Sequence, residues 1–120
     1  MKNMTDVRSM AESCSACGAC TKNCLFLQRY VKSPRKYFEQ ALSSTLDTED
    51  RKSAFYCMVC GSCKAVCPKN LDPGRAFLAV RGDIVTDNGG AIPIESLKSV
   101  NNHQKLSFSA LLRTLKRGRR

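Results

Sequence analysis

Two cysteine runs decide how this chain folds: residues 14–24 read CSACGACTKNC, and residues 57–68 read CMVCGSCKAVCP. Each run has the spacing C-x2-C-x2-C-x3-C, and the two runs together contain all eight cysteines of the sequence. This spacing is typical of cysteines that bind [4Fe–4S] clusters. The sequence therefore predicts two [4Fe–4S] clusters as cofactors, one for each complete run.

The spacing of the cysteines follows from the shape of the cluster. A cubane presents four iron corners, and three cysteines on one short loop can reach three of them. The fourth cysteine usually ligates the other cluster in two-cluster proteins. Gly18 and Gly61 follow the second cysteine of each run. The absence of a Cβ there lets the backbone approach the inorganic core and turn its N–H toward a sulfide.

Length and composition indicate one small protein domain that is held together by metal. A chain of 120 residues buries a limited hydrophobic core, so a further cross-link is plausible. Residues 1–13 contain no apolar stretch long enough for a signal peptide, and no run approaches the roughly 20 apolar residues of a membrane span. We therefore expect a cytoplasmic protein whose clustered cysteines bind metal rather than form disulfides.

The sequence around the two runs contains residue patterns that mark the starts of helices. Ser33 precedes Pro34 and Asp72 precedes Pro73, which is the pattern of a capping residue followed by proline at the first helical position. No segment shows the alternation of a strand. The expected fold is therefore all-α, with two cluster-binding loops between packed helices. The expected helices cover residues 4–13, 34–44, 48–56 and 73–88, with a short buried helix or turn at residues 25–31.

The basic charge of the chain is concentrated at its C-terminal end. Residues 96–120 contain seven basic residues and no acid, whereas 13 basic and 10 acidic residues give residues 1–95 a net charge of +3. We expect residues 1–100 to form the dicluster domain and residues 101–120 to form a basic amphipathic helix and tail. The helix is expected after the Asn101-Asn102 pair, with apolar positions at helical spacing at Phe108, Leu111, Leu112 and Leu115.

The basic C-terminal segment is expected to dock an acidic partner protein. An anionic membrane surface is the competing target, because a basic amphipathic helix can lie on one. Membrane contact is otherwise expected only through a partner. Nucleic acid is the less favoured target, because the segment lacks interleaved aromatic residues for base stacking.

The two runs, the helical residues 25–56 between them and the absence of strands resemble the α-helical ferredoxins. This family includes the C-terminal domain of the iron–sulfur subunits of succinate dehydrogenase and fumarate reductase, and the C-type iron–sulfur component of heterodisulfide reductase. The sequence is most similar to the heterodisulfide reductase branch, because both runs are complete and no [2Fe–2S] domain precedes them. Leu25 stands where family members usually have proline after the fourth cysteine, whereas Pro68 fits the pattern.

The resemblance implies electron transfer within a larger redox complex. The expected partner is a redox protein with a CCG domain or a flavin, because the cysteine-rich CCG module is absent from this sequence. The fourth-cysteine rule and the resemblance together predict crossed ligation. Cys14, Cys17, Cys20 and Cys67 are expected to hold cluster 1, and Cys57, Cys60, Cys63 and Cys24 to hold cluster 2.

The alternative from another class is a zinc-stabilised, all-cysteine binding module whose basic tail contacts nucleic acid. The single histidine, His103, excludes a zinc finger with two cysteines and two histidines, and also a Rieske centre. No phosphate-binding glycine loop and no nucleophile–base constellation is present. We therefore expect no catalytic site and no small-molecule substrate site in this chain, whose role would be electron transfer within an oxidoreductase.

Overall fold

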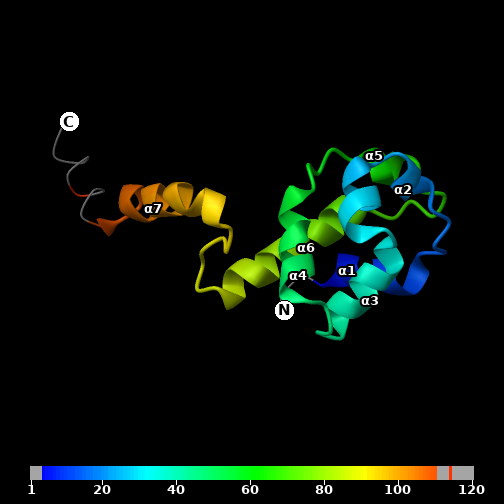
Figure 1. Cartoon of the computed structure of the whole chain (residues 1–120), viewed down its shortest axis with the longest axis horizontal. Helices are drawn as coiled ribbons and strands as arrows, with labels where there is room; N and C mark the ends of the chain where they lie inside the picture. Colours follow the sequence, from blue (N-terminus) through cyan, green and yellow to red (C-terminus); the bar gives the residue numbers. More distant parts are fainter. Residues whose placement is uncertain (1–3, 111–113, 115–120) are drawn as a thin grey trace. The chain divides into compact units, whose positions relative to one another are not determined.

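The structure is a computed structural model that describes residues 4–110 and Thr114. Within this part of the chain the secondary structure is helical and no strand occurs, which confirms the prediction of an all-α fold. The helices in chain order are α1 (Thr5–Ser13), α2 (Ala19–Lys22), η1 (Leu27–Val31), α3 (Pro34–Leu42), α4 (Thr48–Ser53), η2 (Ala54–Tyr56), α5 (Ser62–Ala65), α6 (Pro73–Asp87), η3 (Glu95–Leu97) and α7 (Lys98–Ser107). Figure 1 shows their course.

The chain divides into two compact units, Met1–Ile84 and Val85–Arg120. The first unit contains both cysteine runs. Helices α3, α4 and α6 begin where the sequence predicted, at residues marked by a proline or an aspartate. Pro34 is the first residue of α3, and the Asp47 carboxylate accepts a hydrogen bond of 3.3 Å from the Glu49 amide at the start of α4.

The core of the first unit lies between α1, α3 and α6. Val7 of α1, Phe38 of α3 and Phe77 of α6 are almost fully buried. The Phe38 and Phe77 rings lie 4.8 Å apart between centroids, and Tyr37 packs on Phe77 at 5.4 Å. The Tyr37 hydroxyl donates to the Asp50 carbonyl at 3.0 Å, and burial raises the pKa of Tyr37 to about 12. This aromatic cluster holds together the helices that lead into and out of the two runs.

The segment 25–31 corrects one expectation from the sequence. It is helical, but only Leu27 is buried, whereas the Leu25 side chain is 82% exposed and Tyr30 is 41% exposed. The reason is that successive side chains in a helix point about 100° apart, so Leu25, Phe26 and Leu27 cannot all face the core. The apolar residues of this segment therefore do not share one inward face.

The second unit corrects where the C-terminal helix starts. The Asn101-Asn102 pair lies inside α7, which begins at Lys98 and ends at Ser107. The Asn101 side-chain amide donates to the Ile92 carbonyl at 2.9 Å and so links α7 to the preceding turn. Phe108 follows the helix and is exposed. The other apolar positions of the expected stripe, Leu111, Leu112 and Leu115, lie outside the described residues.

Candidate iron–sulfur site

The two cysteine runs fold in the same way. The thiols of Cys14 and Cys57, the first cysteines of the runs, each accept a hydrogen bond of 3.4 Å from the backbone amide two residues later. Gly18 and Gly61 have φ angles of 77° and 81°. Each glycine precedes a one-turn helix, α2 or α5, and Figure 1 shows these two helices side by side. The structure thus contains an internal repeat built around the two runs.

Backbone strain occurs at matching positions in both runs. Ala16 and Val59 each precede the second cysteine and have φ angles of 56° and 53°. A β-branched residue such as Val59 rarely adopts this left-handed conformation, which costs on the order of 1–3 kcal/mol. The surrounding structure must compensate for this cost, and strained residues of this kind cluster at functional sites. The sequence did not reveal this strain, because neither position carries a glycine.

Four cysteines from both runs line one cavity. Cys14, Cys17 and Cys20 of the first run meet Cys67, the last cysteine of the second run. The cavity has a volume of about 130 Å³. A single water needs roughly 10–15 Å³, so the cavity is large enough for a polyatomic group. Thiolates are soft ligands that suit iron–sulfur clusters, so the cavity and its donors fit a [4Fe–4S] cluster.

The other four predicted ligands lie around the start of the second run. Burial raises the pKa of the Cys57 thiol, and the nearby Cys24 and Cys60 thiols raise it further. The influence of Cys24 on the pKa of Cys57 indicates that these two thiols, one from each run, interact electrostatically. Burial likewise raises the pKa of Cys63, with a smaller contribution from Cys57. The assignment of Cys24 to the cluster of Cys57, Cys60 and Cys63 stays a prediction.

The remaining thiols differ in their surroundings. Burial raises the pKa of Cys20, whereas hydrogen bonding to Ser62 lowers the pKa of the exposed Cys60 thiol. Because cysteine binds metal as the thiolate, cluster assembly must release the protons of the partly buried thiols. Within residues 4–110 and Thr114, no three His, Cys, Asp or Glu side chains form a group that could hold a single metal ion.

Aromatic side chains near the cysteine runs form a chain of ring contacts. Phe26 packs edge-on against the buried Phe77, with centroids 5.2 Å apart. Tyr30 stacks on Tyr56 at 5.1 Å, and both tyrosines are partly exposed. Phe26 also contacts Tyr30 at 5.9 Å, so the rings lead from the core to the surface beside Cys57.

A substitution at Gly61 tests the conformation of the second run. Gly61→Ala is expected to weaken retention of the cluster, because an alanine at a φ of +81° costs roughly 1–2 kcal/mol. A Cβ at this position meets nothing within 4 Å, so the effect is conformational rather than steric. The measurement is the iron retained after a fixed exposure to a chelator under anaerobic conditions.

The matched control is Gly82→Ala in the middle of α6. A Cβ there also meets nothing within 4 Å, but the glycine is helical. Alanine should therefore leave iron retention unchanged and stabilise the helix by about 0.5–1 kcal/mol. Equal iron loss in the two variants would contradict the role assigned to the left-handed glycine.

Comparisons with known proteins agree with the site. A family model described as a 4Fe-4S dicluster domain matches residues 13–72. The C 2 iron-sulfur subunit of the CoB–CoM heterodisulfide reductase from Methanocaldococcus jannaschii is 29% identical over 66 residues, which is 55% of this chain and 36% of the relative. The aligned region thus spans about a third of that relative's length. No solved structure matches.

These matches confirm the resemblance and the [4Fe–4S] cofactors predicted from the cysteine spacing. Among the described residues, no helix is long and apolar enough to cross a membrane.

Proposed function

Because the chain belongs to the 4Fe-4S dicluster domain family and has an iron–sulfur electron-transfer role, we propose that it relays single electrons through two clusters within an oxidoreductase complex. The observation that carries this proposal is the cavity at which Cys14, Cys17 and Cys20 meet Cys67. A bound cluster supplies reversible one-electron chemistry. The polypeptide supplies the thiolates, holds them in place and limits the access of water.

The ligands are proposed to cross between the runs. Cys14, Cys17, Cys20 and Cys67 would hold cluster 1, which the shared cavity supports. Cys57, Cys60, Cys63 and Cys24 would hold cluster 2, which the interaction between Cys24 and Cys57 supports. With this wiring, each cluster joins the two halves of the internal repeat, so that the cofactors become part of the fold.

Membership of a larger complex is supported by the surface beside cluster 2. Leu25 follows its ligand Cys24, and Met58 follows its ligand Cys57; these two side chains are 82% and 87% exposed. In the first run, Ser15 takes the place of Met58. Exposed apolar side chains next to a redox centre favour protein docking. The relative carries the name of a heterodisulfide reductase component, and a redox protein with a CCG domain or a flavin is the partner we propose here.

Anaerobic purification from the native source tests this function. We expect about eight irons and eight acid-labile sulfides per chain, with an EPR spectrum broadened by two interacting clusters after reduction. A redox partner should co-purify at low salt. Stoichiometric zinc without iron would contradict the proposal and favour the zinc-stabilised module.

Deleting residues 89–120 is the control for the basic segment. The truncated chain keeps both cysteine runs and all of α6, so its iron content should be unchanged. If the segment docks an acidic partner, as we propose, binding should weaken and become less sensitive to salt. Loss of iron from the truncated chain alone in solution would show that the segment supports the cluster domain instead.

A further inference from the structure

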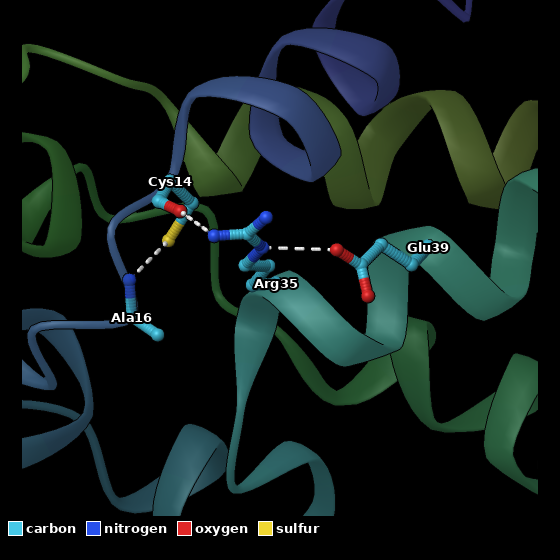
Figure 2. Close-up of polar contacts among 4 residues, drawn as sticks. All are labelled: Cys14, Ala16, Arg35 and Glu39. Atoms are coloured by element: carbon cyan, nitrogen blue, oxygen red, sulfur yellow. Dashed lines mark hydrogen bonds and ion pairs between the residues drawn. The ribbon is translucent and has the colours of Figure 1, made fainter.

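Two arginines contact the two cysteine runs at equivalent points. Arg35 of α3 donates from Nη1 to the carbonyl of Cys14 at 3.0 Å. Arg81 of α6 donates from Nη2 to the carbonyl of Cys57. Figure 2 shows the Arg35 guanidinium pointing at the Cys14 carbonyl while the Cys14 thiol accepts from the amide of Ala16. Each run is therefore held at its first cysteine by a cation from a following helix.

The backbone at the two contacts is nearly identical. Cys14 and Cys57 share a φ of −67°, and their ψ angles are 125° and 128°. The arginines, however, come from different turns of their helices: Arg35 lies in the first turn of α3, and Arg81 lies in the middle of α6. Their separations from the cysteines are 21 and 24 residues. Both runs thus have an arginine bound to the carbonyl of their first cysteine, although the two arginines occupy different positions in their helices.

Arginine suits this role because its planar guanidinium stays charged and donates in several fixed directions. The Arg81 Nε also donates to the carbonyl of Ala54 at 2.8 Å, and its guanidinium lies 5.7 Å from the centre of the Phe55 ring. The Arg35 Nε donates to Glu39 at 2.9 Å, as Figure 2 shows. Both guanidinium groups are therefore fixed by at least two partners.

We propose that Arg35 and Arg81 are positioning residues that fix the two cluster loops and raise the reduction potentials of the clusters held there. The inference rests on the proposed function. A positive charge near a redox centre favours the state with the added electron, and solvent weakens this effect for a partly exposed side chain such as Arg35. Because Glu39 partly neutralises Arg35, the effect of Arg81 should be the larger one.

Redox titration of the full-length holoprotein, followed by EPR, tests this inference. Arg81→Gln is expected to lower the equilibrium constant for reduction of one cluster about tenfold, which is about 59 mV for one electron. Arg35→Gln should also lower the reduction potential of the other cluster, but by a smaller amount. The lysine variants of both positions keep the charge and should restore at least half of each shift. Lys36→Gln is the matched control, since it removes an exposed charge from the residue after Arg35.

Glu39→Gln gives a second test with the opposite sign. Removing this carboxylate leaves the Arg35 charge uncompensated, so the potential of the cluster affected by Arg35 should rise. Glu49 also pairs with a cation, Lys52, at 2.8 Å, and Glu49→Gln should change neither potential. A rise after Glu39→Gln cannot come from weaker packing alone, because a merely structural role for the ion pair predicts lower stability without a change in potential.

The outcomes separate this inference from the proposed function. Protein that contains no iron would overturn both. Protein with two clusters whose potentials move no more in the glutamine variants than in Lys36→Gln would overturn the inference alone. If a glutamine variant fails to assemble its cluster, the lysine variant of the same arginine is used to test the inference. If the cluster assembles with lysine, the result supports the inference that a positive charge positions the loop. Equal failure with lysine overturns that inference.

Discussion

Replacing Cys14 and Cys67 together with alanine is expected to leave one intact [4Fe–4S] cluster, with about four irons per chain. Replacing Cys14 and Cys24 together is expected to leave no cluster with four thiolates. The reason is that the first pair belongs to one proposed ligand set, whereas the second pair removes one ligand from each set. Both variants lose two thiols, so a difference between them depends on which cysteines bind the same cluster and not on the number of cysteines.

The measurements are iron and sulfide content together with the EPR spectrum of the reduced protein. The variant lacking Cys14 and Cys67 should show a sharper spectrum, since no neighbouring cluster remains to broaden it. The converse pair, Cys57 with Cys24, should behave like Cys14 with Cys67. If each run closed on its own cluster, the variant lacking Cys14 and Cys24 would instead keep the intact cluster, and the crossed assignment would be wrong.

Short-range chemistry made much of the fold predictable. The starts of α3, α4 and α6 depend on a proline or on a carboxylate within a few residues, so the sequence alone places them. At the start of α6 the Asp72 carboxylate accepts from the Arg75 amide at 3.2 Å. The cofactor was equally predictable, because the four cysteines of each run must follow one another at fixed intervals to reach a cubane.

Features that depend on tertiary contacts were not predictable. The contacts from Arg35 and Arg81 to the first cysteines span 21 and 24 residues, and no local pattern points to them. The exposure of Leu25 depends on which face of its helical turn packs against the core, and the buried residue there is Leu27. The one-turn helices α2 and α5 were missed, although the glycine at the same place in both runs was the signal that could have revealed them.

Removing the clusters with an anaerobic chelator and reductant is expected to abolish the tertiary structure of the first unit. One loop from each half of the internal repeat carries the cysteines, and without metal the partly buried thiols of Cys20, Cys57 and Cys63 have no iron to bind. A small core around Phe38 and Phe77 then has to fix the helices by itself. Because a site of this kind does not preexist in the unfolded chain, binding free energy is also folding free energy.

The expected signature is loss of the near-ultraviolet circular dichroism of the aromatic core, with much of the far-ultraviolet helical signal retained. The helices should partly survive, because capping at residues such as Asp47 acts locally and does not require the clusters. Restoring iron and sulfide under anaerobic conditions should bring back the near-ultraviolet signal and a cooperative thermal transition. If the metal-free protein keeps the near-ultraviolet signal and the cooperative thermal transition, the packing of α1, α3 and α6 alone determines the fold. The clusters would then occupy a site that is already formed.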